Sequence, residues 1–324
     1  MHKQFLGFLC AVAVVAGACS SGGDDSPKRA ASTTRKTTTT TTVATTTTTA
    51  VAAVAAAAPR TFSNATADDP ALAAADIAAA EVATLDAATS PAELNNAAVA
   101  LQLAYRRISL RDVSVEQAIA AAIPSNLVIP RDVLVQAMAF NVAAGRHLIA
   151  LGGKSAPKDA PPAEWKIIAP VPSDELIAHY KTASLETKVP WPILAAVNFV
   201  ETRLGRVAGV SSAGAQGPMQ FLPSTWAAYG KGDINSVKDS IAAAARYLQL
   251  NGAPERMDDA LWRYNHSDHY VEAIKAYANR ISLDVNSFRG YYNWQVTYRT
   301  KAGLLILPVG WPTVPAMNAG LSLV

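Results

Sequence analysis

The sequence predicts a mainly helical protein that ends in a short β-hairpin, and three observations support this fold class. Half of the 324 residues are hydrophobic but only 7% are aromatic, because alanine, the strongest helix former, supplies much of the apolar fraction. Serine or aspartate followed by proline recurs at the start of apolar stretches, which is typical of helix N-termini. Near the C-terminus the spacing of apolar residues changes from helical to alternating.

The composition excludes several classes of protein. With 28 basic and 25 acidic residues the net charge is only +3, so the sequence offers no broad basic surface for nucleic acid. Both cysteines, Cys10 and Cys19, lie near the N-terminus, so the body of the chain lacks the clustered cysteines of a structural zinc site. No glycine-rich nucleotide-binding motif follows a strand-like stretch. We therefore expect no cofactor, no metal and no nucleic-acid partner.

A basic start and an apolar run, Phe5–Ala18, begin the chain. These 14 residues would form a helix of about 21 Å, too short to cross a bilayer core of about 30 Å. Together with the small residues before Cys19, the run predicts a signal peptide over residues 1–18. The segment resembles a bacterial lipoprotein signal, in which Cys19 would carry the lipid, although Ala16 stands where leucine is usual. An ordinary signal peptide with an incidental cysteine is the alternative.

A threonine-rich stretch follows the apolar run. Thirteen of the 17 residues from Thr33 to Thr49 are threonine, a composition that buries too little apolar surface to fold. Residues 19–60 are therefore interpreted as a lipidated cysteine followed by a disordered stalk. We expect an extracytoplasmic protein of the cell envelope, either lipid-anchored to the membrane or secreted.

Residues 61–153 are predicted to form an alanine-rich helical domain. Asp69-Pro70 and Ser90-Pro91 each supply a capping residue followed by proline, and Glu93 completes a capping box. We expect three or four helices here and no chemistry. Residues 154–172 contain five prolines and are interpreted as a linker or a strap that covers the core. Because the candidate catalytic residues all follow Ser173, the sequence predicts that the alanine-rich domain is dispensable for activity.

Residues 173–283 contain the strongest candidate for a catalytic side chain. Ser173 is expected to cap a helix that ends near Thr187, and Pro192 begins a second helix that stops before Gly205. Glu201 lies four residues after Val197, on the apolar face of that second helix and in its last turn. An apolar setting and the negative end of the helix dipole should both raise the pKa of the Glu201 carboxyl, as a general acid requires. A glutamate that turns out to solvent or pairs with a nearby arginine is the alternative.

A small, polar and flexible stretch, residues 210–220, comes next. Its glycines allow the backbone to approach a ligand closely, and Ser211, Gln216 and Gln220 offer hydrogen bonds. Such a loop suits a sugar, which needs many directional contacts and little charge. On composition alone, a surface turn is the favoured interpretation.

The C-terminal segment, residues 284–324, is predicted to be a β-hairpin tail. Tyr292, Trp294, Val296 and Tyr298 alternate, and Leu304–Val309 forms a second apolar run after a glycine. Covering the core is the main role we expect for it.

Three motifs of residues 173–283 resemble, in order and spacing, those of the lytic transglycosylase domain. They are Glu201-Thr202-Arg203, the stretch Ser211-Ser212-Ala213-Gly214-Ala215-Gln216-Gly217-Pro218-Met219-Gln220, and Tyr264-Asn265. The resemblance is greatest to secreted transglycosylases of actinobacteria. It covers about a third of the chain and implies a goose-lysozyme-like helical fold that cleaves the glycan strands of peptidoglycan.

The resemblance also implies roles for individual residues. Glu201 falls on the catalytic glutamate of the family, and the substrate-binding positions fall on Ser211, Gln220, Tyr264 and Asn265. Four positions depart from the family pattern: Thr202 replaces serine, Pro218 replaces leucine, and His266-Ser267 replaces Ala-Gly. The last departure lies in the wall of the expected cleft.

The implied reaction cleaves the β-1,4 bond between N-acetylmuramic acid and N-acetylglucosamine and leaves 1,6-anhydro ends. The partners implied are peptidoglycan strands, a membrane reached through the lipid anchor, and candidate proteins of the cell-wall machinery. A lysozyme-like hydrolase on the same fold is one alternative, and a catalytically silent glycan-binding module is another. A glutamate on an apolar stripe favours an enzyme, because a binding module has no need of it.

Overall fold

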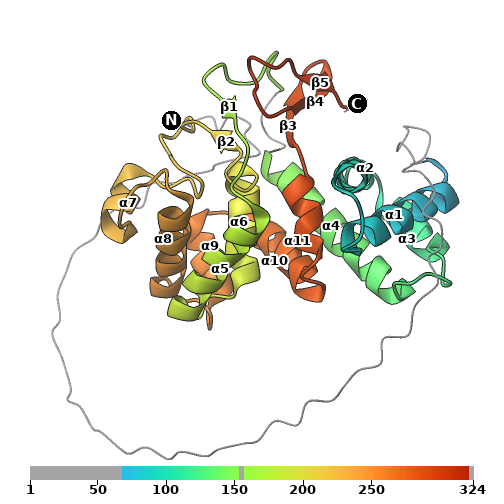
Figure 1. Ribbon diagram of the computed structural model, residues 1–324, viewed down its shortest axis with the longest axis horizontal. Coiled ribbons are helices and arrows are strands. Elements are labelled where there is room, and N and C mark those ends of the chain that lie inside the picture. The colour runs from blue at the N-terminus through green and yellow to red at the C-terminus, as the bar shows by residue number, and fades with distance from the viewer. Residues whose placement is uncertain (1–67, 153–156, 321–324) are drawn as a thin grey trace, which may run out of the picture. The chain divides into compact units, whose positions relative to one another are not determined.

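The computed structural model of the protein describes residues 68–152 and 157–320. The expected signal peptide, Cys19 and the threonine-rich stalk lie outside these residues, so those three features remain predictions. Within the described residues the chain is mainly helical and ends in strands (Figure 1). This arrangement confirms the mainly helical fold with a C-terminal hairpin and is consistent with a lysozyme-like domain.

The described residues form four N-terminal helices, seven later helices and five short strands. The N-terminal helices are α1 (Pro70–Leu85), α2 (Pro91–Ser109), α3 (Val113–Ala122) and α4 (Arg131–Gly152). The later helices are α5 (Ser173–Thr187), α6 (Trp191–Thr202), α7 (Pro223–Tyr229), α8 (Val237–Leu250), α9 (Met257–Tyr264), α10 (Asp268–Leu283) and α11 (Ser287–Asn293). The strands are β1 (Lys166–Ile167), β2 (Val207–Ala208), β3 (Val296–Thr300), β4 (Gly303–Leu307) and β5 (Met317–Asn318).

The caps expected for the first two helices are present. The Asp69 side chain accepts hydrogen bonds from the backbone amides of Ala71 and Leu72. Ser90 and Glu93 form the reciprocal capping box at the start of α2. These bonds satisfy amide groups that a helix N-terminus otherwise leaves without partners. At α5, however, Pro172 occupies the cap and Ser173 is the first helical residue, so the expected serine cap is not formed.

The N-terminal helices do not have a core of their own. Helix α4 packs along α10, and α1 and α2 contact α11. Buried apolar residues of α1–α4 and of α5–α11 belong to one continuous hydrophobic cluster. Thus the segment that the sequence places in a separate alanine-rich domain shares its core with the segment that contains Glu201.

Helix α4 is long and apolar enough to cross a membrane by length and composition. Leu134, Met138, Val142 and Leu148 of this helix are nevertheless buried within the shared core. Burial of this face accounts for its apolar character without a membrane.

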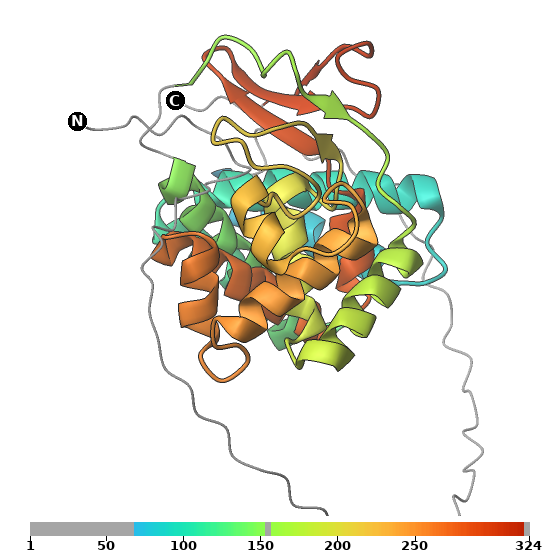
Figure 2. The ribbon, with the colours of Figure 1, turned by 90° about the vertical axis from the view of Figure 1, so that its left-hand side faces the viewer.

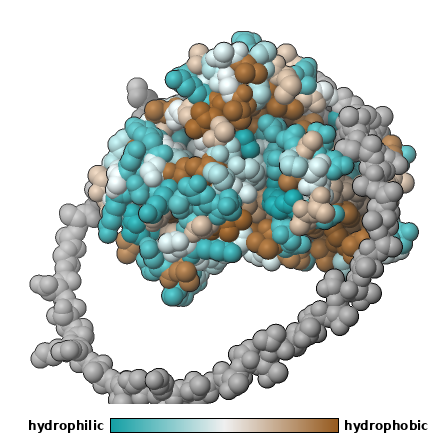
Figure 3. All heavy atoms as spheres, in the orientation of Figure 1, coloured by the Kyte–Doolittle hydropathy of each residue, from teal (hydrophilic) through white to brown (hydrophobic). Residues whose placement is uncertain are grey.

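The strands form a separate layer over the helices (Figure 2). Strands β3 and β4 are the two arms of the expected hairpin, and β5 adds a third antiparallel strand. The strap over 157–172 contributes β1, which pairs with β2. Trp165 of the strap packs edge-on against Tyr298 with ring centroids 5.7 Å apart. Figure 3 shows apolar side chains gathered over these strands at the top of the view.

The sequence analysis places the start of the alternating, extended segment at Tyr292, which is too early. Residues 287–293 form helix α11, and the strand starts only at Val296. Phe288, Tyr291 and Trp294 are buried in the main core, so the aromatic residues of this segment follow helical spacing before the extended strand begins. The tail is therefore a helix followed by the sheet.

Candidate functional site

Helix α6 places Glu201 inside the protein. Every residue from Pro192 to Thr202 is buried, and Glu201 is only 3% exposed. The helix ends because Arg203 and Leu204 adopt left-handed backbone conformations, with φ of 54° and 62°, followed by Gly205 at 84°. Glu201 therefore lies in the last turn, as the apolar spacing predicts.

The carboxylate of Glu201 accepts a hydrogen bond from a tyrosine that the sequence analysis did not single out. The Tyr270 hydroxyl, on the first turn of α10, donates to Glu201 Oε1 at 2.7 Å. Burial raises the pKa of the Tyr270 phenol well above its ordinary value, and the Glu201 charge raises it further. Tyr270 consequently remains a protonated hydrogen-bond donor across the physiological range.

A second tyrosine, Tyr264, lies beside this pair. Its ring is parallel to that of Tyr270, with an interplanar angle of 4° and centroids 6.3 Å apart. Burial raises the pKa of the Tyr264 phenol, with a further contribution from Glu201. The structure thus brings Tyr264, one of the predicted binding residues, close to the predicted catalytic carboxylate.

Helices α6 and α9 hold one end of the loop over 211–220 by hydrogen bonds. Pro218 O accepts hydrogen bonds from Thr202 Oγ1 at 2.6 Å and from Asn198 Nδ2 at 2.8 Å. The next carbonyl, Met219 O, accepts from the Tyr264 hydroxyl at 2.7 Å. Because two successive carbonyls are held by α6 and α9, this end of the loop has a fixed position relative to Glu201.

Ser211 shapes the beginning of the loop. Its hydroxyl oxygen accepts hydrogen bonds from the amides of Ala213 and Ala215, at 3.3 and 3.0 Å. At the other end, Gly217 has a φ of 74°, and a Cβ there would lie 2.0 Å from Ile234 O. Only glycine fits this position. Gly217 is therefore required by the turn itself.

Gln220 and Asn265 complete the predicted set. Gln220 is half-buried, and its side-chain amide donates to Gly217 O at 3.0 Å. Asn265 is 2% exposed, and its Oδ1 atom has no hydrogen-bond partner within the described residues. A buried amide oxygen without a partner is costly.

The arginines that follow Glu201 and the aspartates at 233, 239, 258 and 259 have contacts of their own. The guanidinium of Arg203 lies 4.1 Å from the centre of the Phe199 ring, and Arg206 donates to Tyr292 O at 2.6 Å. Asp258 pairs with Lys275 at 2.9 Å. The other loop aspartates bond locally: Asp233 with Asn235, Asp239 with the Asp233 amide, and Asp259 with Arg256. Within the described ranges, no group of three or more histidine, cysteine, aspartate or glutamate residues is arranged to hold a metal ion.

Tyr270 is the functional candidate that sequence reasoning missed. Its position in the first turn of a helix resembles that of any core aromatic residue, and its distance from Glu201 along the chain hides their contact. The only sequence signal is that its helix directly follows the Tyr264-Asn265 motif.

Comparison with known proteins gives one informative similarity. The chain is 29% identical over 122 residues to the membrane-bound lytic murein transglycosylase F of Thiobacillus denitrificans. The aligned region covers 35% of this chain and 26% of that relative, so the chain matches about a quarter of the relative's length. No family model matches the chain, and no solved structure matches it. The similarity supports a lytic transglycosylase at a coarse level.

Proposed function

We propose that the protein is a peptidoglycan lytic transglycosylase. The observation that carries this proposal is the buried Glu201 carboxylate, bonded to Tyr270 and flanked by a loop of small polar residues. A buried carboxylate is expensive unless it has a role or a partner. The named activity of the Thiobacillus denitrificans relative agrees with this chemistry.

In the proposed reaction Glu201 acts first as an acid. It protonates the oxygen of the bond between N-acetylmuramic acid and N-acetylglucosamine as that bond breaks. The acetamido group of the muramic acid ring stabilises the charge that develops at its anomeric carbon. Glu201, now a carboxylate, accepts the proton of the 6-hydroxyl as that oxygen closes on the anomeric carbon. The product is a 1,6-anhydro sugar, and Glu201 regains its proton.

An internal nucleophile makes a second carboxylate unnecessary. The 6-hydroxyl belongs to the reacting sugar, so its effective concentration is high. Most glycosidases instead place two carboxylates on opposite sides of the bond. The aspartates at 233, 239, 258 and 259 have partners of their own, and all but the half-buried Asp239 are exposed. This favours the transglycosylase over the lysozyme-like hydrolase.

The remaining predicted residues would bind the glycan. Gln220, which is half-buried, supplies hydrogen bonds to sugar hydroxyl and amide groups, and Asn265, whose buried Oδ1 atom lacks a partner, is the second binding residue. Tyr264 fixes the loop through Met219 and forms part of the wall beside Glu201. Ser211 acts by shaping the loop, and its hydroxyl hydrogen remains available to an acceptor.

The deciding experiment compares Glu201→Gln with unaltered protein on purified cell wall. The variant should fold and lose about 10²–10⁴-fold in activity, because glutamine cannot exchange a proton. Glu186→Gln, at an exposed position on α5, is the matched control. Mass spectrometry of the products separates the alternatives, since anhydro ends are lighter than reducing ends by one water. Reducing ends would indicate a hydrolase. Binding without cleavage would indicate a glycan-binding module.

We also propose that the protein acts in the cell envelope, held to the membrane through a lipid on Cys19. The relative is named as membrane-bound, and a small-residue stretch precedes Cys19 in the sequence. Cys19→Ala should move the protein from the membrane fraction to the soluble fraction. An unchanged distribution would contradict lipid attachment at this position.

A further inference from the structure

Helix α10 connects the candidate site to the N-terminal helices. Tyr270, in its first turn, donates to Glu201. Ten residues later, Arg280 faces α1 and is only 2% exposed. These two side chains are about 15 Å apart along the helix axis, at roughly 1.5 Å per residue. A regular helix of this length moves as a nearly rigid rod, so the position of one end affects the other.

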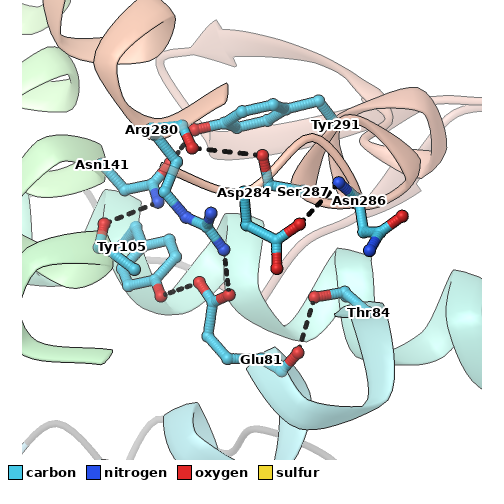
Figure 4. A network of polar contacts seen from close by, with 10 residues as sticks. Glu81, Thr84, Tyr105, Asn141, Arg280, Asp284, Asn286, Ser287 and Tyr291 are labelled. Atoms are coloured by element: carbon cyan, nitrogen blue, oxygen red, sulfur yellow. Dashed lines mark hydrogen bonds and ion pairs between the residues drawn. The ribbon is translucent and has the colours of Figure 1, made fainter. Parts of the chain in front are cut away.

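Arg280 forms a buried ion pair with α1. Its Nη2 atom donates to Glu81 Oε2 at 2.6 Å, and the Tyr105 hydroxyl of α2 donates to Glu81 Oε1 at 2.5 Å (Figure 4). Glu81 is 2% exposed. Both charges are therefore compensated inside the protein, and the contact joins α1, α2 and α10 at one point.

A second contact lies at the other end of α10. His269, next to Tyr270, has its Nδ1 atom 3.1 Å from Nδ1 of His147 on α4. The N-terminal helices thus contact α10 at two places, at His269 next to Tyr270 and at Arg280. None of these side chains belongs to the glycan-binding set described above.

We propose that Glu81 and Arg280 are positioning residues for catalysis, because they fix α10 so that the Tyr270 hydroxyl stays on Glu201. This inference rests on the proposed function. Without the Glu81 charge, the Arg280 guanidinium would be buried and uncompensated, and it would move toward solvent. The movement would carry α10 with it and lengthen the bond at Tyr270.

The test uses the full chain and four variants: Glu81→Gln, Tyr270→Phe, the double variant, and Tyr291→Phe as a matched control. Tyr291 lies in the same interface and donates to Asn141 at 2.6 Å, but it belongs to α11. Glu81→Gln should lower kcat on cell wall about tenfold and leave KM within about twofold. In the Tyr270→Phe background, the same change should have no further effect on kcat, because both act through one bond. Tyr291→Phe should leave kcat unchanged.

A second measurement is independent of activity. The pKa of the Glu201 carboxyl can be followed by carbon NMR of labelled protein. Loss of a hydrogen bond to a carboxylate raises its pKa, so Tyr270→Phe and Glu81→Gln should both raise it, and Tyr291→Phe should not. Arg280→Gln, which breaks the same ion pair from the other side, is the second variant if Glu81→Gln does not fold.

Two results would overturn the inference. One is a Glu81→Gln effect on kcat of equal size in the presence and absence of the Tyr270 hydroxyl. The other is a Glu201 pKa that is unchanged in both Glu81→Gln and Arg280→Gln. If the unaltered protein does not cleave cell wall, the proposed function fails, and the pKa measurements still decide whether the coupling exists.

Discussion

His147 shows how one side chain makes stability depend on pH. Its Nδ1 atom contacts that of His269. Burial is the main cause that lowers the pKa of the His147 imidazole, and the neighbouring His269 imidazole lowers it further. The negative charge of Glu272 opposes this shift. Below about pH 6.5 the unfolded chain takes up a proton at this position more readily than the folded protein does. The contribution of His147 to the free energy of unfolding should therefore be fully present above that pH, and it should be lost as the pH falls through the lowered pKa.

Urea unfolding at pH 7 and pH 5 checks this expectation. His147→Gln should reduce the loss of unfolding free energy between the two pH values. His179→Gln, at a histidine that contacts Glu175 within its own helix, controls for the removal of a histidine. Equal losses in His147→Gln and in unaltered protein would show that the histidine pair does not control the acid limb.

At the scale of residues, the sequence predicts the place of Glu201 but not its partner. Helical spacing is a local property, and it locates Glu201 on the apolar face of the last turn of its helix. The Tyr270 bond joins residues 69 positions apart, so no local pattern reports it. Ser211 illustrates a different limit: a loop serine can serve the backbone or a ligand, and only the structure shows its bonds to Ala213 and Ala215.

Among the elements, the contact between α6 and the loop gives a sharp test. Thr202 is fully buried and donates to Pro218 O, while its oxygen accepts from the Gly205 amide at 3.0 Å. Thr202→Val keeps the shape but leaves that buried amide without its acceptor, at a cost of about 1–3 kcal/mol. Because the loop leads to Gln220, kcat/KM should fall by about ten- to 100-fold.

Thr202→Ser is the matched control, because it keeps the hydroxyl. Its kcat/KM and thermal midpoint should stay near those of unaltered protein, and the valine variant should lose both. Full kcat/KM in Thr202→Val would mean that Asn198 alone holds Pro218 in place.

Helices were easier to predict than the start of the sheet. Capping residues and proline locate α1, α2 and α6 because these signals act within one turn. From 287 to 298, aromatic residues occur at positions compatible with both helical and alternating spacing. Packing of Phe288 and Tyr291 into the main core selects the helix, and this choice depends on residues far away in the chain.

At the scale of the whole molecule, the sequence suggests a domain boundary after residue 153, but the hydrophobic core extends across it. The sequence leaves a linker and a covering strap as alternatives for 154–172, and residues 157–172 form a strap that contributes a strand and a buried Trp165. The ion pair between Glu81 and Arg280 joins residues 199 positions apart. Contacts of this range leave no trace in composition or periodicity, so the division of the chain into separate helical segments could not be judged from the sequence.

Truncation provides the test of that division. The sequence predicts that residues 173–324 keep activity without the alanine-rich helices, but the structure leads us to expect the opposite. Removing α1–α4 would expose to water the apolar faces of α10 and α11 that now pack against them and would remove Glu81, the partner of Arg280. Exposing a large apolar side chain costs about 1.5–3 kcal/mol, so a few such side chains amount to a large part of the roughly 5–15 kcal/mol that holds a domain folded.

A chain from Asp68 to Val324 should therefore unfold cooperatively and cleave cell wall, whereas a chain from Ser173 to Val324 should be insoluble or lack a cooperative transition. Circular dichroism with thermal melting, followed by a wall digest, distinguishes the two. A soluble Ser173–Val324 protein that melts cooperatively and releases glycan fragments would show that the N-terminal helices cover the catalytic segment without supporting it.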